Sequence, residues 1–228
     1  MNFVIIVLFL FTFCSCAERN VKQDQNYTFQ AINPTAILHK TNEIPDPWEL
    51  RQSQEGIPVY TRKVAGSPIL EYKANVIIDA PISKAIELFE DDKQISRWYF
   101  QCVHSEKVEH VGPKQEIIYL ILHLPWPVAA RDFVFSRTRT EDLANKTISY
   151  SLTALPDRLP AVKGVIRVRS IRSLWRFKSL PNGQTELFFQ QHTDPAGSIP
   201  YSIINQLAVQ TPFYSLRNFR KLITGKDA

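Results

Sequence analysis

The longest amphipathic pattern in the chain runs from Pro200 to Thr224. Apolar residues recur there at helical spacing on one side and polar residues occupy the other, which predicts one long helix. Ser198 is a favoured N-cap, Pro200 suits the first turn, and Gly225 provides a stop. Pro212 removes one backbone hydrogen bond, so we expect a kink there. Such a helix needs a concave partner to cover its apolar stripe.

The segments before this helix are predicted to form mainly strands. Asp46 predicts the start of a helix that ends at Gly56, Pro81 precedes a second helix, and residues 95–99 form a short helix or turn. Segments rich in β-branched and aromatic residues predict strands at 59–64, 69–78, 105–111, 115–124, 133–139, 147–155, 164–177 and 185–193. Their short connections imply antiparallel neighbours. The predicted fold class is α+β, with a strongly curved sheet that grips the terminal helix.

The N-terminus carries a second apolar pattern, over residues 3–13. Its length suits a signal peptide at 1–16 and is short for a membrane-spanning helix. Two interpretations stay open: Cys16 is lipidated as in a bacterial lipoprotein, or signal peptidase cleaves before Ala17. Both predict export, to the periplasm or as a membrane-anchored lipoprotein in a bacterium, and secretion otherwise. Residues 17–44 are polar without a clean period and predict a linker, so we expect the folded domain at 45–225.

Composition describes an ordinary globular chain. Its 228 residues are 44% hydrophobic and 21% charged, which is enough to build a substantial core. A net charge of +5 is compatible with a transient contact to an anionic membrane surface but is too diffuse to indicate nucleic-acid binding. Cys102 is the one thiol expected in the folded domain, which excludes an internal disulfide framework. HExxH, GxSxG, P-loop, GxGxxG and paired CxxC motifs are missing from the sequence, so we expect no cofactor and no metal.

Several short motifs occur in the order and spacing of a known family. They are WEL at 48–50, GIPVY at 56–60, Trp98, RDFV at 131–134 and DPAGSIP at 194–200. Together they resemble the START domain, the steroidogenic-acute-regulatory-related lipid-transfer family, over residues 45–225. The resemblance implies a helix-grip (START / Bet v 1-like) fold with an internal tunnel for one lipid and the terminal helix as its lid. It also implies binding or transfer without catalysis. Family ligands range over sterols, glycerophospholipids and ceramides, and nothing in this sequence selects one.

Alternation along the strands divides candidate ligand contacts between two faces. Leu122 shares one face of its strand with other leucines, whereas Tyr119 and His123 lie on the other. Arg131 shares a face with Phe133 and is expected in the interior, where it either meets a polar head group or forms a structural ion pair. Trp126 sits in a turn and enters a membrane interface, rims the tunnel mouth or caps the core. The predicted ligand-binding residues are Arg131, His123, Tyr119, Phe133, Leu122, Trp126, Tyr150, Phe189, Ile203 and Leu207.

These patterns lead to a functional hypothesis with two alternatives. The chain is expected to bind one hydrophobic molecule and carry it to or between membranes as a monomer, with the terminal helix hinged near Gly197 or Pro212 as a gate. One alternative is a helix-grip enzyme, a cyclase or hydrolase that uses His123, His192 or Asp194 in the same cavity. The other is a lipid sensor that binds without transferring.

Overall fold

The computed structural model describes residues 46–126 and 128–225. The predicted signal peptide at 1–16, the lipidation site Cys16 and the linker at 17–44 lie outside the described residues. The strands are β1 (Glu49–Gln54), β2 (Ile57–Val64), β3 (Ser67–Ile78), β4 (Cys102–Gly112), β5 (Gln115–Leu122), β6 (Arg131–Asp142), β7 (Thr147–Ala154), β8 (Ile166–Arg167), β9 (Ser170–Ser179) and β10 (Thr185–Asp194). The helices are α1 (Ile82–Glu90), the 3₁₀ turn η1 (Asp92–Gln94), α2 (Ile95–Trp98) and α3 (Tyr201–Thr224).

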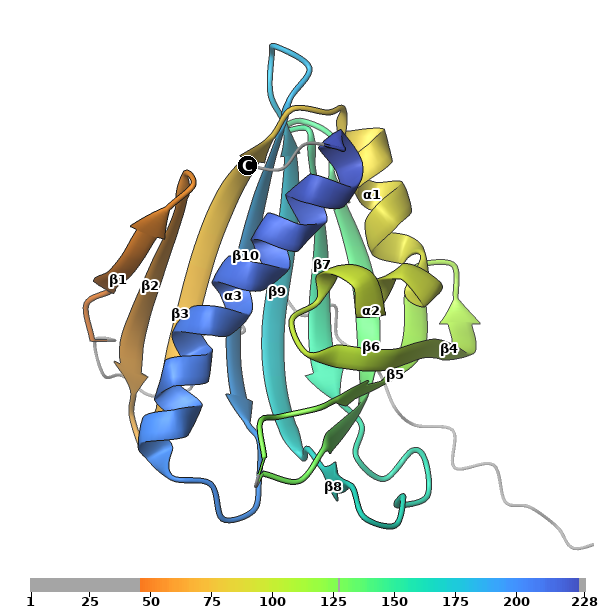
Figure 1. The fold of residues 1–228 in the computed structure, drawn as a ribbon. Coiled ribbons are helices and arrows are strands. Elements are labelled where there is room, and N and C mark those ends of the chain that lie inside the picture. The colour runs from red at the N-terminus through yellow and green to blue at the C-terminus, as the bar shows by residue number, and fades with distance from the viewer. Residues whose placement is uncertain (1–45, 127, 226–228) are drawn as a thin grey trace, which may run out of the picture.

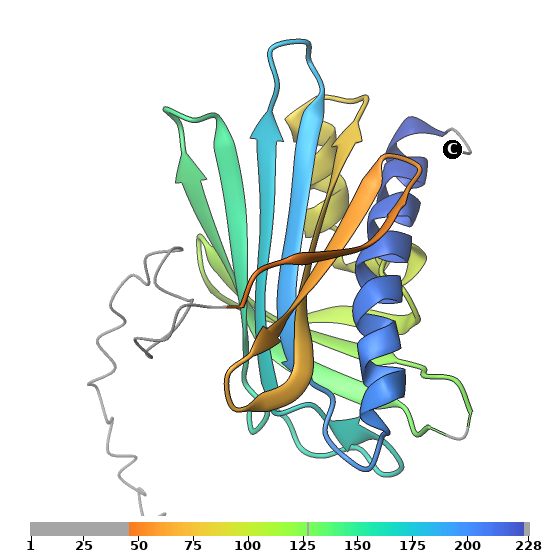
Figure 2. The same ribbon diagram turned by 90° about the vertical axis from the view of Figure 1, so that its left-hand side faces the viewer.

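One ten-stranded sheet wraps around α3, as the resemblance implied (Figure 1). Its order is β1-β2-β3-β10-β9-β7-β6-β5-β4, each neighbouring pair is antiparallel, and β8 joins β6 in parallel. The turned view shows α3 lying along one side of the curved sheet (Figure 2). The predicted α+β class and the curved antiparallel sheet are therefore confirmed.

Alternation explains which strand faces form the concave wall. In β9 the inward residues Ile171, Trp175 and Phe177 are buried, whereas Arg172 and Arg176 between them are exposed. The enclosed core is strongly aromatic. Phe89 of α1 lies against the rings of Trp98, Tyr150, Trp175 and Phe177, and Phe219 of α3 contacts Trp98 with ring centroids 5.1 Å apart. Burying each such side chain contributes roughly 1.5–3 kcal/mol, which fixes α1 and α3 against the sheet.

The prediction of a helix that ends at Gly56 is wrong. Residues 49–54 instead form β1 and pair with β2 through a two-residue turn, in which Glu55 and Gly56 both have positive φ angles. That geometry matches the right-handed twist of a hairpin, so strand pairing overrides the helix-start pattern. Trp48 packs outside the strand, with the guanidinium of Arg62 4.4 Å and the Lys73 ammonium 4.5 Å from its ring centroid.

Two further boundaries differ from the prediction. The single strand expected at 164–177 is divided into the short β8 and the longer β9. α3 begins at Tyr201 after Pro200, whose extended backbone takes the N-cap position, so Ser198 does not cap the helix. Pro212 lies inside α3, which continues to Thr224; the kink stays a prediction. Within the described residues, we find no helix that is long and apolar enough to cross a bilayer.

Candidate functional site

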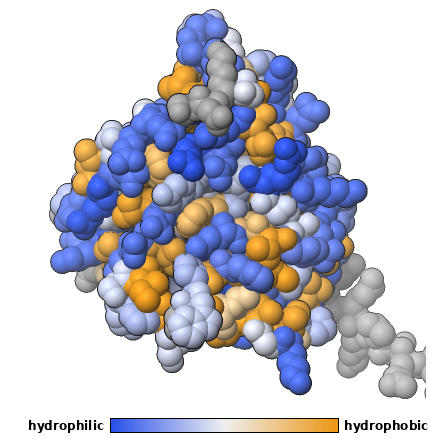
Figure 3. All heavy atoms as spheres, viewed as in Figure 1, coloured by the Kyte–Doolittle hydropathy of each residue, from blue (hydrophilic) through white to orange (hydrophobic). Residues whose placement is uncertain are grey.

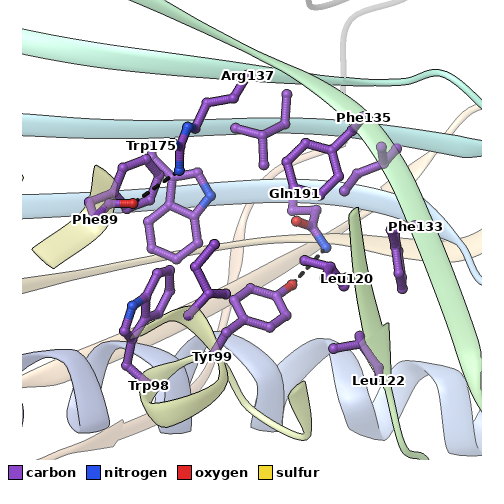
Figure 4. A pocket seen from close by; sticks show the side chains of 13 residues that line it. Phe89, Trp98, Tyr99, Leu120, Leu122, Phe133, Phe135, Arg137, Trp175 and Gln191 are labelled. Atoms are coloured by element: carbon purple, nitrogen blue, oxygen red, sulfur yellow. Dashed lines mark hydrogen bonds between the residues drawn. The ribbon is translucent and has the colours of Figure 1, made fainter. Parts of the chain in front are cut away.

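Two small adjoining cavities lie in the interior. The inner cavity, of about 30 Å³, is lined by Phe89, Trp98, Leu120, Phe135, Arg137 and Trp175 (Figure 4). The loop-side cavity, of about 80 Å³, is lined by Ile69, Leu70, Leu124, Arg131, Ile204 and Leu207. Tyr99, Leu122, Phe133 and Gln191 line both. The interior is thus mainly apolar, with one arginine in each cavity.

The arginine of the inner cavity, Arg137, belongs to a charge-balanced network. Only 3% of Arg137 is exposed; its Nη1 donates to the Phe89 carbonyl at 3.0 Å, and its Nη2 lies 2.9 Å from Asp92 and 2.5 Å from Glu116. Lys107 contacts the same two carboxylates, at 3.4 and 2.7 Å. Two cations therefore face two anions, and the charge in this network is neutralised by the protein.

The two carboxylates of that network respond differently to burial. Desolvation raises the pKa of Asp92 despite the attraction of Arg137 and Lys107. Desolvation would also raise the pKa of Glu116, but hydrogen bonds and charges from Lys107 and Arg137 outweigh it and leave the pKa lowered. Two buried donors at this network, Nε of Arg137 and Nε1 of Trp98, have no acceptor among the residues that the structure describes. The inner cavity therefore offers free donors to an occupant.

The arginine of the loop-side cavity, Arg131, is held by main-chain carbonyls. Only 2% of it is exposed, and it donates to the carbonyls of Ala129 at 2.5 Å, Pro195 at 3.2 Å and Ala196 at 3.0 Å. Desolvation lowers the pKa of Arg131. Among the described residues no carboxylate pairs with it, so the predicted alternative of a structural ion pair is wrong. Arg131 joins the start of β6 to the loop that enters α3.

Gly197 permits this close approach. Its φ is +74°, and a Cβ atom at this position would lie 3.1 Å from Nη2 of Arg131 and 3.1 Å from Cδ1 of Ile166. A side chain would therefore meet both a strained backbone and two close neighbours. The glycine of the DPAGSIP motif brings the α3 entry loop onto Arg131.

The next residue, Asp132, fixes a second loop, on the outer face of the sheet. It is fully buried and accepts two hydrogen bonds from Arg167, at 3.0 and 2.8 Å. Arg167 in turn donates to the carbonyls of Pro156, Leu159 and Pro160, so it holds the loop between β7 and β8. Adjacent strand residues point to opposite faces, so the Arg-Asp pair anchors two different loops at one end of the sheet.

Four of the ten predicted ligand-binding residues line the cavities. Leu122 and Phe133 line both, and Arg131 and Leu207 line the loop-side cavity. Ile203 packs beside the cavities with the small cluster formed by Ile69, Ile199 and Ile204. Whether any of these side chains contacts a ligand stays a prediction.

The other five lie elsewhere. Tyr119 packs on the outer face of β5 with Ile117 and Val134, because strand alternation turns it away from Leu120 and Leu122. His123 is exposed after β5, and Trp126 is 93% exposed in the β5–β6 loop. Tyr150 and Phe189 are buried in the aromatic core: the Tyr150 hydroxyl donates to Glu90 at 2.5 Å, and Phe189 stacks on Trp175.

Sequence reasoning missed several residues of the cavity wall. Arg137 continues the inward period of Arg131, Phe133 and Phe135, and Gln191 continues that of Leu187 and Phe189. Period-two extension would have found both. Tyr99 reaches the cavity from the residue that follows α2, and no periodic signal marks it.

The residues of the enzyme alternative do not meet in a cavity. His192 lies on the outer face, 3.3 Å from the hydroxyl of Ser67 and from the carbonyl of Ile69, and desolvation followed by the charge of Arg172 lowers its pKa. Asp194 accepts a hydrogen bond from the Ala196 amide, and His123 is exposed. The described residues contain no cluster of metal-ligating side chains. The arrangement favours enclosure of an apolar molecule.

Comparison with known proteins agrees with this geometry. The START domain family model matches residues 35–223. An uncharacterised protein of Pseudomonas aeruginosa is 32% identical over 179 residues, which cover 78% of this chain and 88% of that protein. The human phosphatidylcholine transfer protein is 26% identical over 166 residues, covering 71% of this chain and 76% of the relative. A crystal structure of a STAR-related lipid transfer protein from Xanthomonas axonopodis superimposes with a TM-score of 0.73 at 31% identity, covering 78% of this chain and 99% of that one.

Proposed function

Because this chain belongs to the START domain family, we propose that it holds one lipid between the sheet and α3 and carries it to or between membranes. The observation that carries the proposal is the apolar interior, whose walls include buried donors that find no acceptor in the described part of the chain. Each buried CH₂ of a lipid tail contributes roughly 0.8 kcal/mol, so this lining provides affinity without a charged partner. The names of the human and Xanthomonas relatives, which describe lipid transfer, support the same class of ligand.

The size of the cavities implies that the interior opens when a lipid enters. Volumes of about 30 and 80 Å³ are well below the roughly 300–1,000 Å³ of sites that enclose small molecules. We infer that α3 and its entry loop are the moving parts. The first turns of α3 line the loop-side cavity, and the α3 entry loop is attached through Arg131.

The same end of the molecule supplies a surface for membrane contact. Trp126 is 93% exposed and Tyr201 is 56% exposed, on the β5–β6 loop and at the start of α3. Figures 1 and 2 place these two segments at one end, and apolar side chains gather on that part of the face in Figure 3. Tryptophan and tyrosine favour the membrane–water interface. We propose that this end touches the membrane during loading and release.

A disulfide that holds α3 tests the gate. The Leu70 amide donates to the Asn205 side chain at 3.1 Å, so the pair Leu70→Cys and Asn205→Cys joins β3 to α3. Oxidation is expected to abolish transfer of fluorescent phosphatidylcholine between vesicles, and reduction to restore it. Cys102 interferes little, because burial raises its pKa to about 12.

The matched control is a disulfide within the β1–β2 hairpin, from Leu50→Cys and Tyr60→Cys, which face each other in the register. It is expected to leave transfer unchanged. Equal transfer by the oxidised and reduced α3–β3 variant would contradict the gate. Native mass spectrometry of the full chain, with extraction and identification of the bound molecule, tests lipid binding itself.

We propose in addition that the protein acts without catalysis, as a monomer, and is exported. None of the three residues of the enzyme alternative lines the inner or the loop-side cavity, which supports the absence of catalysis. Turnover of an extracted lipid by the purified chain would contradict the absence of catalysis. A dimer mass in native spectra would contradict the monomeric state. The mass of the mature N-terminus separates a diacylglyceryl group on Cys16 from cleavage before Ala17.

A further inference from the structure

A belt of uncharged polar side chains lies in the interior at the boundary of the two cavities. Two of its residues, Tyr99 and Gln191, line both cavities, and the other two, Tyr72 and Thr193, line the loop-side cavity. Gln191 of β10 lies directly opposite Tyr72 of β3 in the sheet register, and Thr193 follows Gln191 on the same inner face. Tyr99 reaches the belt from the end of α2, and Nε2 of Gln191 donates to its hydroxyl at 3.4 Å (Figure 4). The belt therefore consists of Tyr72, Tyr99, Gln191 and Thr193.

The belt has hydrogen-bonding capacity that the protein does not fill. Among the described residues, the buried hydroxyls of Tyr72 and Thr193 form no hydrogen bond of good geometry, and the Tyr99 hydroxyl interacts only weakly with that of Tyr72. Only 5% of Tyr72 is exposed. Both tyrosines keep their protons: burial, together with the neighbouring Tyr99 hydroxyl, raises the pKa of Tyr72 well above its ordinary value, and burial raises that of Tyr99 to about 12. Unpaired buried polar groups are costly, so these donors are best satisfied by an occupant.

The surroundings of the belt limit what that occupant is. On one side the inner cavity is largely aromatic, with Phe89, Trp98 and Trp175 in its wall. On the other side the loop-side cavity is largely aliphatic, with Ile69, Ile204 and Leu207. The belt carries no ionised group, and the arginines lie in the separate parts of the two cavities. A molecule that spans both cavities thus meets neutral donors near its middle and apolar walls on either side.

We propose that this belt recognises a neutral carbonyl acceptor, as in an ester or amide linkage, set between two apolar portions of the bound molecule. The inference rests on the proposed lipid-binding function and narrows it to acyl lipids. A carbonyl oxygen at the belt accepts a hydrogen bond from the Tyr72 hydroxyl and takes the place of the missing protein acceptor. A sterol has a single hydroxyl at one end and leaves the belt unpaired, which disfavours it.

A matched pair of lipids tests the proposal on the full chain. The probes are a diacyl phosphatidylcholine and its dialkyl ether analogue with the same chain lengths, which lacks only the two carbonyl groups. Binding from vesicles is followed by tryptophan fluorescence, since Trp98 and Trp175 line the inner cavity, and by native mass spectrometry. The wild-type chain is expected to prefer the diacyl lipid by about tenfold, the difference typical of one buried hydrogen bond.

Two variants test whether the preference for the diacyl lipid comes from the belt. Tyr72→Phe and Gln191→Met are expected to reduce it to about twofold or less, while binding of the ether lipid changes little. Tyr150→Phe is the control, because it removes a buried tyrosine hydroxyl that bonds to Glu90 away from the cavities. It is expected to keep the preference, and unfolding midpoints establish that all three variants fold.

The outcomes separate the belt from the function on which it rests. Equal binding of the diacyl and ether lipids by the wild type, or an unchanged preference in both Tyr72→Phe and Gln191→Met, overturns the belt and leaves lipid binding intact. Tighter binding of cholesterol than of the diacyl lipid also overturns the belt alone. Failure of the wild type to bind any of the three lipids overturns both.

Discussion

Two arginines on one strand, Arg131 and Arg137, have similar burial and opposite electrostatic settings. Both lie on the inner face of β6 and are at most 3% exposed. Arg137 faces Asp92 and Glu116, which Lys107 also contacts. Within the described residues, Arg131 donates to three carbonyls and to no carboxylate, and these carbonyls lie on the segments before β6 and before α3. The two arginines are therefore equally buried, but one is held by carboxylates and the other by main-chain carbonyls.

The difference indicates which end of the interior opens more easily. Removing Arg137 leaves two carboxylates, Asp92 and Glu116, to share Lys107, so the end under α1 is locked by charge. Removing Arg131 leaves no carboxylate without a partner. It frees carbonyls that lie in loops close to solvent, where water replaces the lost donor. We therefore expect the loop-side end, with the start of α3, to be the less stable end of the fold.

The largest expected effect is that of Arg137→Leu. Losing the guanidinium leaves buried Asp92 and partly buried Glu116 with one cation fewer, which should lower the free energy of unfolding by about 3–5 kcal/mol. Urea denaturation measures the loss. Arg139→Leu is the control on the same strand: its pair with Glu90 is partly exposed and should cost at most about 1 kcal/mol. Similar losses in the two variants would contradict the assignment of Arg137 to a locked network.

A smaller effect is expected from Arg131→Leu. Three hydrogen bonds to main-chain carbonyls disappear without leaving a buried anion, so the free energy of unfolding should fall by about 2 kcal/mol. The local effect should be stronger: amide hydrogen exchange should accelerate in residues 194–200 and change little under α1. A loss as large as that of Arg137→Leu, or unchanged exchange in this loop, would show that the two arginines do not differ in this way.

The smallest effect concerns the pH dependence of the inner network. The pKa of Glu116 is lowered in the folded chain, because Lys107 and Arg137 outweigh its desolvation. Its contribution to stability is therefore fully present above its ordinary pKa of 4.5 and is lost as the pH falls through the lower folded value. The pKa of Asp92 is raised, so Asp92 acts in the opposite direction.

The variant Glu116→Gln isolates the contribution of Glu116 to the pH dependence of stability, because Asp92 is present in both proteins. The variant should be less stable than the wild type at pH 7, and the gap between the two should narrow below pH 4.5. Unfolding midpoints in urea between pH 3 and 7 measure that gap. A constant gap over this range would mean that the ionised form of Glu116 is not favoured by folding.

Much of the architecture follows from local patterns in the chain. Period-two alternation in segments such as 115–124 and 185–193 predicts strands with one apolar face, and the 3.6-residue period after Pro200 predicts α3. The short helix-start pattern before Gly56 fails, because β1 gains a strand partner through the Glu55–Gly56 turn. Local propensity therefore predicts the secondary structure of long elements such as α3. The structure of a short segment such as β1 is decided by whether it pairs with a neighbouring strand.

The sequence by itself determined the fold class, the family and the two faces of several strands, such as those at 147–155 and 185–193, because these depend on periodicity and on motifs with fixed spacing. Only the tertiary structure decided which inward residues line a cavity and which fill the core. Tyr150 and Leu152 share a face of β7, yet Tyr150 is packed under Phe89 while Leu152 lines the inner cavity. The belt likewise arises from β3, β10 and α2, and the distance between segments far apart in the chain is set by packing, which no local pattern encodes.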